Sequence, residues 1–216
     1  MTFELFAHTP PLDDEPLSDG AVVLRGFATA RAAQLEADLE VVTAAAPLRH
    51  LVTPGGYRMS VAMTNCGALG WVSDRRGYRY DPVDPGSGER WPALPEAFRA
   101  LARDAAARAG YASFMPDACL VNRYAPGARL SMHQDRDEKD LRAPIVSVSL
   151  GLPAVFLWGG HERTDKARRI ALQHGDVVVW GGPSRLRFHG VLALKDGEHP
   201  FAGGFRINLT FRKVRA

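Results

Sequence analysis

Two stretches of the chain repeat their apolar residues at the spacing of an amphipathic helix. The first covers residues 29–46, with Thr29 as the expected N-cap and Pro47 as the residue that stops it. The second covers residues 95–110, because proline is favoured in a first helical turn and glycine after a last one. The apolar face of the second stretch contains Phe98, Leu101 and Ala105. Both stretches predict helices that pack against a larger body.

From Cys119 onward, the pattern changes to short apolar runs separated by turn residues. Six runs have the length and composition of strands: 120–124, 145–150, 155–158, 169–172, 176–180 and 206–211. Short strands that follow helices along the chain predict an α+β protein with a sandwich or jelly-roll body.

The segment 53–91 shows neither the helical spacing of apolar residues nor the short apolar runs of strands. It contains three of the five tyrosines and two of the four tryptophans, among many glycines and prolines. A long aromatic segment without a period is typical of a functional loop or lid, so we expect it to lie over a site rather than in the core. Its five arginines are balanced by four acidic residues, so any attraction to nucleic acid must be aromatic as much as electrostatic.

The composition indicates a globular protein of one domain, with 216 residues, 46% of them hydrophobic and 24% charged. It excludes a disordered, collagenous or coiled-coil protein. Residues 1–20 contain five acidic residues and no lysine or arginine. We therefore expect an acidic N-terminal tail at 1–20 and one basic domain at 21–216, whose charge permits a polyanionic partner without requiring one.

The cysteines and the N-terminus favour a cytoplasmic protein. Cys66 and Cys119 are too few and too far apart for a disulfide framework or a paired-cysteine zinc site. An acidic first segment is the opposite of a targeting peptide. The longest apolar stretch, 145–158, is interrupted by serine, glycine and proline, so we expect no membrane span.

The pattern His-x-Asp occurs twice, at His133/Asp135 and at His174/Asp176. Residues two apart on extended backbone point to the same face, so each pair can share one metal ion. The second pair flanks a glycine just before a predicted strand, which favours a hairpin turn. The first pair opens the polar run HQDRDEKD after a loop, which favours the rim of a site. Two histidines and one carboxylate on one octahedral face suit non-haem iron.

A third ligand must come from elsewhere in the chain, and the candidates are His161, His189 and His199. His189 follows a predicted strand and its turn, and a later strand of a jelly roll folds back beside an earlier one. His199 precedes a proline in a predicted loop. The spacing therefore favours His189 and leaves the other two as alternatives.

Polar and apolar residues alternate strictly over residues 206–212. An ordinary half-buried strand with its polar face in water explains this pattern by itself. The alternative is a polar face that holds a dicarboxylate inside a barrel, because arginine donates charge-assisted hydrogen bonds to carboxylates. That face contains Arg206, Asn208, Thr210 and Arg212, and Asn122 and Tyr124 add similar donors on another predicted strand.

The order His133-x-Asp135, His189, Arg206-x-Asn208-x-x-x-Arg212 is similar to that of a known enzyme family. Longer stretches extend the similarity over most of the chain beyond residue 20: TPGGYRMSVAMTNCG from Thr53, PDACLVNRYAPGA from Pro116, HQDRDE from His133, DLRAPIVSVSLGLPAVF from Asp140, HGDVVVWGG from His174 and RINLTFR from Arg206. On these residues the chain resembles the Fe(II)/2-oxoglutarate dioxygenases and, more narrowly, the bacterial AlkB family of oxidative DNA-dealkylation enzymes.

The resemblance implies a double-stranded β-helix (a jelly roll) with supporting helices, in which residues 21–216 form one dioxygenase domain with a nucleotide-recognition lid at about 48–92. It implies Fe(II) bound by His133, Asp135 and His189. It also implies 2-oxoglutarate as co-substrate, O2 as oxidant, and a co-substrate site formed by Asn122, Tyr124, Arg206, Asn208 and Arg212.

The implied substrate is single- or double-stranded DNA with alkylated bases such as N1-methyladenine and N3-methylcytosine, with RNA as a further substrate. The implied reaction removes the methyl group as formaldehyde and releases succinate and CO2, and the enzyme is expected to be a monomer. The implied substrate contacts are Trp71, Tyr78, Tyr80, Asp137 and Arg163. Because these lesions carry a positive charge, Trp71 and the Asp137 carboxylate would favour them over neutral bases.

Three other functions remain as alternatives. The same oxygenase chemistry can act on a protein side chain or a small molecule, and the aromatic segment 53–91 argues against that substrate class. A non-catalytic binder of damaged nucleic acid needs no open iron positions. A zinc hydrolase with the same three ligands would leave Arg206 and Arg212 without a dicarboxylate to hold.

Overall fold

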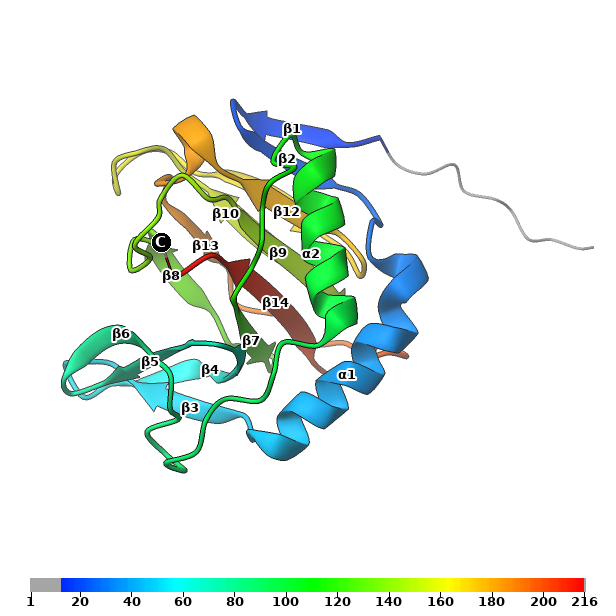
Figure 1. Ribbon diagram of the computed structural model, residues 1–216. Helices are drawn as coiled ribbons and strands as arrows, with labels where there is room; N and C mark the ends of the chain where they lie inside the picture. Colours follow the sequence, from blue (N-terminus) through cyan, green and yellow to red (C-terminus); the bar gives the residue numbers. More distant parts are fainter. Residues whose placement is uncertain (1–12, 216) are drawn as a thin grey trace, which may run out of the picture.

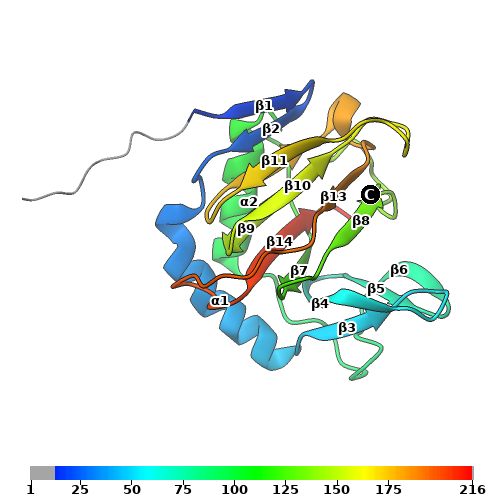
Figure 2. The same cartoon turned by 180° about the vertical axis from the view of Figure 1, so that it is seen from behind.

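Two antiparallel β-sheets lie face to face, and two helices cover the outer face of the larger sheet (Figures 1 and 2). The computed structural model describes residues 13–215. The larger sheet has eight strands in the order β1-β2-β12-β9-β14-β7-β4-β3, and the smaller has four in the order β11-β10-β13-β8. A separate two-stranded hairpin, β5-β6, stands beside them.

The elements have the following bounds. The larger sheet contains β1 (Glu15–Ser18), β2 (Ala21–Leu24), β3 (Arg49–Val52), β4 (Arg58–Gly67), β7 (Ala118–Tyr124), β9 (Ile145–Gly151), β12 (Val177–Trp180) and β14 (Arg206–Arg212). The smaller sheet contains β8 (Leu130–His133), β10 (Ala154–Trp158), β11 (Arg168–Leu172) and β13 (His189–Val191). The hairpin contains β5 (Gly70–Asp74) and β6 (Gly77–Asp81), and the helices are α1 (Ala32–Ala45) and α2 (Glu96–Arg108).

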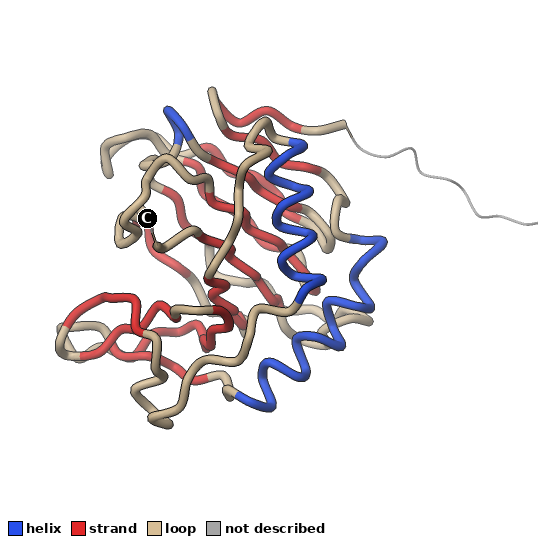
Figure 3. Tube along the Cα trace, viewed as in Figure 1, coloured by secondary structure: helices blue, strands red, loops and turns tan. Residues whose placement is uncertain are grey.

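Both predicted helices are confirmed, and they lie on one side of the molecule (Figure 3). α2 begins after Pro95 and buries the expected Phe98, Leu101 and Ala105. Within residues 13–215, no helix has the length and apolarity that crossing a membrane requires.

The predicted N-cap role of Thr29 is wrong. Thr29 lies inside a short 3-10 turn, Thr29–Arg31, and its side chain makes no capping hydrogen bond. Backbone bonds close this turn, because Thr29 N donates to Gly26 O and Arg31 N donates to Ala28 O, each at 3.0 Å. The α-helix therefore starts only at Ala32.

The core has two layers, one on each face of the larger sheet. The layer under the helices includes Phe98, Leu101, Val146, Val148, Leu209 and Phe211. The layer between the sheets includes Tyr124, Ile145, Phe156, Trp158, Val178 and Trp180. Burying such a side chain contributes about 1.5–3 kcal/mol. The six predicted strands are all present, and the predicted α+β class with a jelly-roll body is confirmed.

The predicted acidic tail is wrong from Glu15 onward. β1 pairs with β2 at one edge of the larger sheet, and Leu17 is buried there. The Glu15 carboxylate is neutralised by Arg25 and by Arg168, which lies 3.5 Å away. Residues 1–12 lie outside the described residues. An acidic composition therefore conceals an edge strand whose charge is paired with the rest of the fold.

Only part of the segment 53–91 lies outside the main sheets. β4 pairs with β3 and β7 inside the larger sheet, and its residues 61–66 are buried. Burial of both faces removes the alternation that marks a half-exposed strand, so the sequence pattern gives no strand signal there. The hairpin β5-β6 instead projects on the same side of the molecule as the end of β8 (Figures 1 and 2).

Replacing Phe98 with alanine tests the layer under the helices. Phe98 is fully buried and meets Phe211 edge to face, with ring centroids 6.0 Å apart. The cavity left by Phe98→Ala should lower the free energy of unfolding by about 3–5 kcal/mol. Arg103→Ala, on the exposed face of α2, should change it by less than about 0.5 kcal/mol. Urea unfolding measures both, and equal midpoints for the two variants would contradict this packing.

Candidate active site

Two strands of the smaller sheet bring His133 and His189 together. β8 ends at His133, β13 begins at His189, and the two residues are direct partners in the antiparallel register. Asp135 lies two residues beyond His133, so its side chain returns to the same face. The structure thus brings together the predicted set His133, Asp135 and His189, and their ligand atoms all lie within 4.8 Å of one another.

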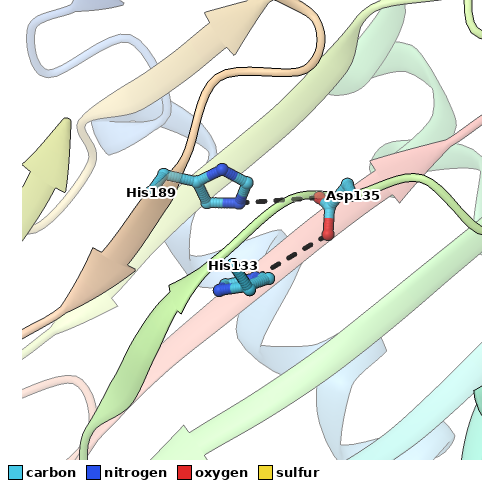
Figure 4. A group of neighbouring side chains, drawn as sticks. All are labelled: His133, Asp135 and His189. Carbon is cyan, nitrogen blue, oxygen red and sulfur yellow. Dashed lines mark ion pairs between the residues drawn. The ribbon is translucent and has the colours of Figure 1, made fainter. Parts of the chain in front are cut away.

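The carboxylate of Asp135 faces the Nε2 atoms of both imidazoles from one side (Figure 4). Its Oδ1 is 3.7 Å from His133 Nε2, and its Oδ2 is 3.8 Å from His189 Nε2. The two histidine rings are 4.4 Å apart between centroids. Two imidazole nitrogens and one carboxylate on one side of a common point are a donor set that holds a divalent transition metal and leaves positions open.

Backbone carbonyls hold both histidine rings in the orientation that metal binding requires. His133 Nδ1 is 2.8 Å from Ser131 O, and His189 Nδ1 is 3.0 Å from Arg187 O. A carbonyl only accepts hydrogen bonds, so each Nδ1 carries the proton and each Nε2 offers its lone pair to a metal. Burial and the neighbouring His133 lower the pKa of His189 to about 4, which keeps its ring neutral at physiological pH.

Arg212 keeps Asp135 ionised. Burial by itself raises the pKa of Asp135, but the charge of Arg212 and its hydrogen bond outweigh burial and hold the pKa below its usual range. Arg212 Nη2 donates to Asp135 Oδ2 at 2.8 Å. A permanently charged carboxylate is the form that binds a cation.

The polar face of β14 is not in water. All seven residues of the strand are buried, because β14 lies between β7 and β9. The alternative of a half-buried strand with a solvated polar face is therefore wrong. The register places Asn208 opposite both Asn122 and Ser149, and Arg206 opposite Tyr124.

The amide of Asn208 is fully used by protein groups. Its Nδ2 donates to Ser147 Oγ at 2.8 Å and to Val148 O at 2.9 Å. Its Oδ1 accepts from Thr210 Oγ1 at 2.9 Å and from Asn122 Nδ2 at 3.3 Å. Asn208 therefore fixes its neighbours, whereas the buried Oδ1 of Asn122 has no partner among the described residues.

Arg206 is a buried cation that lacks an anion. Its side chain lies over the Tyr124 ring, 4.9 Å from the centroid, and its Nη2 donates to Ser149 Oγ at 2.7 Å. Its Nε and Nη1 are buried without a hydrogen-bond partner in the described part of the chain. Burial lowers the pKa of Arg206, because the charge of a buried guanidinium is poorly solvated. A carboxylate ligand would satisfy both the charge and the free donors, so these residues fit a dicarboxylate co-substrate.

A second carboxylate, Glu138, links the cluster to the hairpin. Tyr80 donates its hydroxyl to Glu138 Oε1 at 2.6 Å, and Arg185 Nη2 donates to Oε2 at 2.9 Å. Arg212 Nε lies 3.1 Å from Glu138 Oε1, an ion pair without hydrogen-bond alignment. Arg185 also donates to the backbone oxygen of Asp135 at 2.5 Å. The sequence predictions missed both Glu138 and Arg185, and only the acidic run after His133 signalled the first.

The predicted substrate residues lie in two places. The hairpin brings Trp71 onto Tyr78, with stacked rings 5.5 Å apart, and Trp71 Nε1 donates to Asp137 Oδ2 at 2.9 Å. Tyr80 points to Glu138, as described above. Arg163 is exposed on the loop after β10, and its guanidinium lies 5.5 Å from the Phe188 ring centroid. No bond joins Arg163 to the hairpin among the interactions of residues 13–215.

The second His-x-Asp pair forms a turn, as predicted, but the turn is not a hairpin, because it connects β11 of the smaller sheet to β12 of the larger one. His174 Nδ1 accepts a bond from Gly151 N at 3.0 Å, and the His174 ring stacks on His199 at 4.6 Å. Asp176 pairs with Arg25 at 2.6 Å. His199 therefore packs against this turn rather than near His133, and His161 is exposed in a loop.

Comparison with known proteins gives the class of this chain. Residues 20–212 match the family described as the 2OG-Fe(II) oxygenase superfamily. The chain is 62% identical over 211 residues to the alpha-ketoglutarate-dependent dioxygenase AlkB of Salmonella typhimurium, which covers 98% of this chain and 97% of that protein. The AlkB of Escherichia coli is 59% identical over 211 residues, with the same coverage of 98% and 97%.

A solved structure titled "The structure of OsALKBH1" has the same fold. It matches with a TM-score of 0.80 at 30% identity and covers 93% of this chain and 100% of that one. The chain therefore belongs to the 2OG-Fe(II) oxygenase superfamily and, within it, to the AlkB dioxygenases.

Two more distant relatives carry names that state a substrate. ALKBH1C of Arabidopsis thaliana is named a DNA N(6)-methyladenine demethylase and is 33% identical over 171 residues, 67% of this chain and 38% of that protein. The protein abh1 of Schizosaccharomyces pombe is named a tRNA demethylase and is 35% identical over 111 residues, 46% of this chain and 37% of that protein. Both relatives are substantially longer than this chain.

Glu138→Ala tests whether the buried carboxylate holds the network together. The change leaves the buried Arg185 without its acidic partner, and it removes one of the two carboxylates that pair with Arg212. We therefore expect the free energy of unfolding to fall by about 3–5 kcal/mol. Asp140→Ala removes the ion pair with the exposed Arg142 side chain and one bond from Arg142 N, and it should cost less than about 1 kcal/mol. Chemical denaturation decides between them, and a Glu138→Ala midpoint equal to that of Asp140→Ala would refute the network.

Proposed function

We propose that this chain removes N-methyl groups from N1-methyladenine and N3-methylcytosine in DNA, and in RNA, as a direct-reversal repair enzyme. It is an Fe(II)/2-oxoglutarate-dependent dioxygenase that uses O2. One observation carries the proposal: a metal-binding cluster lies beside a buried, anion-free arginine and under an aromatic hairpin. The relatives named as DNA and tRNA demethylases support the substrate class.

Three residues hold the iron in this proposal. His133 and His189 supply their Nε2 atoms, and Asp135 supplies one carboxylate oxygen. Their backbone contacts and the Arg212 bond set these atoms in place before the metal arrives. Little rearrangement is needed on binding, which favours a tightly held and correctly oriented ion.

The β14 face holds the co-substrate. Arg206 binds the far carboxylate of 2-oxoglutarate, with Tyr124 beside it. Arg212 and Asn122 lie at the end nearer the cluster and position the keto-acid end. Asn208 contributes by fixing Asn122 and Thr210, since its own amide is already occupied.

The hairpin holds the lesion. Trp71 stacks on the base with the His133 ring on the opposite side, and Tyr78, Tyr80 and Arg163 contact the rest of the substrate. Asp137 accepts a bond from the Trp71 indole, so its charge lies at the edge of the stacking surface. A cationic methylated base gains from both groups, whereas a neutral base gains mainly from stacking. A lesion that blocks pairing also costs less to extrude from a duplex.

Bound Fe(II), 2-oxoglutarate and O2 together supply the oxidation of the N-methyl carbon, with release of succinate and CO2. The chain's residues orient the methyl group towards this centre and keep water away from it. The hydroxymethyl product then loses formaldehyde, which restores the normal base.

The organisation that we propose is one catalytic domain that acts as a monomer in the cytoplasm. The family match over 20–212 and a site assembled from one chain support a single unit. β1 belongs to that unit, and the substrate-facing part of the lid at about 48–92 is the hairpin β5-β6. Cys66 and Cys119 are free and buried, which suits a reducing compartment.

Mass spectrometry of a short single-stranded DNA with one N1-methyladenine tests the proposed function. Incubation with Fe(II), 2-oxoglutarate and ascorbate should remove the methyl mass, and omission of either iron or 2-oxoglutarate should prevent the loss. Succinate formation without loss of the methyl group would reject this substrate and favour a protein or small-molecule substrate.

Alanine at His133, Asp135 or His189 should abolish turnover, because each substitution removes one of three metal ligands. Iron retained after gel filtration should fall in the same variants. His161→Ala is the matched control, since His161 is exposed and lies outside the cluster. Full activity in Asp135→Ala would contradict the metal assignment.

Arg206→Ala should raise the KM for 2-oxoglutarate by about 10- to 100-fold, because a charged hydrogen bond contributes about 1.5–3 kcal/mol. Excess 2-oxoglutarate should restore much of the kcat of Arg206→Ala. The KM of Arg206→Lys should lie between those of the wild type and Arg206→Ala. Arg169→Ala, on the exposed face of β11, should leave KM unchanged. A change in kcat with no change in KM would be the wrong outcome for a carboxylate-binding residue.

Trp71→Ala should weaken lesion binding by about 5- to 150-fold, the range expected for losing one stacked base. Turnover of 2-oxoglutarate without substrate should persist, because Trp71 is not among the residues that hold the iron or the co-substrate. Trp71→Phe keeps an aromatic face and should recover most of the affinity. Lesion affinity measured by fluorescence anisotropy decides, and a wild-type value for Trp71→Ala would refute stacking.

A further inference from the structure

A cleft of about 670 Å³ lies beside the hairpin β5-β6. Three parts of the fold form its walls. The first is the hairpin, through β6 and the residue just before β5; the second is the loop after β8; and the third is residues 214–215, which follow β14. Its volume is within the range of about 300–1,000 Å³ of small-molecule sites. No residue of the metal cluster or the β14 face lines this cleft.

The cleft adjoins the proposed base site. Tyr78 lines the cleft and also stacks on Trp71, 5.5 Å away between ring centroids. Asp137 lines the cleft and also accepts the bond from Trp71 Nε1 at 2.9 Å. Tyr80 adds a second aromatic ring to the same wall. A strand whose lesion stacks on Trp71 therefore passes directly beside this cleft.

The side chains that line the cleft carry a net positive charge, with Arg79, Lys139 and Arg215 against the single carboxylate of Asp137. Arg79 is already paired, at 2.9 Å with Asp74 and at 3.5 Å with Asp81. Lys139 and Arg215 also line the cleft, are exposed, and form no ion pair with an acidic side chain of residues 13–215. Two unpaired cations beside aromatic rings are the combination that binds a phosphate together with its nucleoside.

The fold holds these two cations on anchored backbone. Lys139 N donates to Val214 O at 3.4 Å, which joins the loop after β8 to the segment after β14. Asp117 accepts bonds from Val214 N at 2.7 Å and from Arg215 N at 3.1 Å. An anchored backbone lowers the entropy cost of bringing both side chains to one anion.

We propose that this cleft binds the nucleotide adjacent to the alkylated one on the same strand. Its phosphate lies between Lys139 and Arg215, and its sugar or base lies against Tyr78 and Tyr80. Stacking on tyrosine accepts any base, so the cleft adds affinity for a strand without adding sequence preference. The inference rests on the proposed function, because it needs a nucleic-acid strand in the neighbouring base site.

The test uses the double variant Lys139→Gln/Arg215→Gln. Binding of a single-stranded oligonucleotide with N1-methyladenine is followed by anisotropy at several salt concentrations. Loss of one phosphate contact should make the slope of log affinity against log salt shallower by about 0.7. Because this measurement needs neither iron nor 2-oxoglutarate, it reports the cleft independently of turnover.

Comparing the turnover of two substrates shows whether the double variant loses contacts to the neighbouring nucleotide or to the alkylated one. For a trinucleotide with a central N1-methyladenine, kcat/KM should fall about tenfold in the double variant, an effect of about 1.4 kcal/mol. For the corresponding mononucleotide, which has no neighbour to bind, kcat/KM should stay within about twofold of wild type, or about 0.4 kcal/mol. The control Arg103→Gln/Lys195→Gln removes the same charge from exposed positions that do not line the cleft and should leave both substrates unchanged.

Each possible outcome has a distinct meaning. Equal losses on the mononucleotide and the trinucleotide, or an equal loss in the control, would overturn the cleft assignment. A normal salt slope in the double variant would also overturn it. If the wild type demethylates neither substrate while the salt slope still changes, the proposed function fails and the cleft remains a strand-binding site.

Discussion

A buried contact between Arg212 and Asp135 joins the two sheets where the chemistry takes place. Arg212 lies on β14 in the larger sheet, Asp135 follows β8 of the smaller one, and the two side chains are 2.8 Å apart. An isolated charge is costly to bury, so Asp135 depends on Arg212, and Arg212 depends on Asp135 and Glu138 together. The contact therefore sets the position of the metal cluster relative to the Arg206 face. In the proposed reaction, iron and co-substrate meet because these two surfaces are held at a fixed separation.

The same network reaches the substrate side through Glu138. Arg185 binds both the Glu138 carboxylate and the backbone oxygen of Asp135, and Tyr80 of the hairpin donates to the same carboxylate. The hairpin and the loop that carries Asp135 are thus connected by buried charged bonds, each stronger than a neutral one. This connection gives the aromatic surface a defined place above the cluster, and in our proposal the neighbouring cleft extends that surface along a strand.

The sequence predicted what local patterns encode. Both helices and six strands follow from periodicity, and the His133, Asp135 and His189 set follows from spacing and family resemblance. The patterns could not show β4, because both of its faces are buried and it lacks alternation. They misread β1, because its acidic residue Glu15 is paired with Arg25, which lies just after β2. The acidic run after His133 hints at Glu138 but not at its role, and Arg185 has no signal, since the two depend on partners 47 residues apart.

Anaerobic titration of 2-oxoglutarate into the Fe(II)-loaded protein tests most directly whether the cluster and the Arg206 face form one centre. A 2-oxo acid that chelates Fe(II) produces a visible charge-transfer absorption, and a 2-oxo acid bound away from the metal does not. We expect this absorption to appear, to saturate at one 2-oxoglutarate per chain, and to vanish when zinc replaces iron. Saturable binding of 2-oxoglutarate by calorimetry without the absorption would place the co-substrate away from the metal and contradict the shared centre.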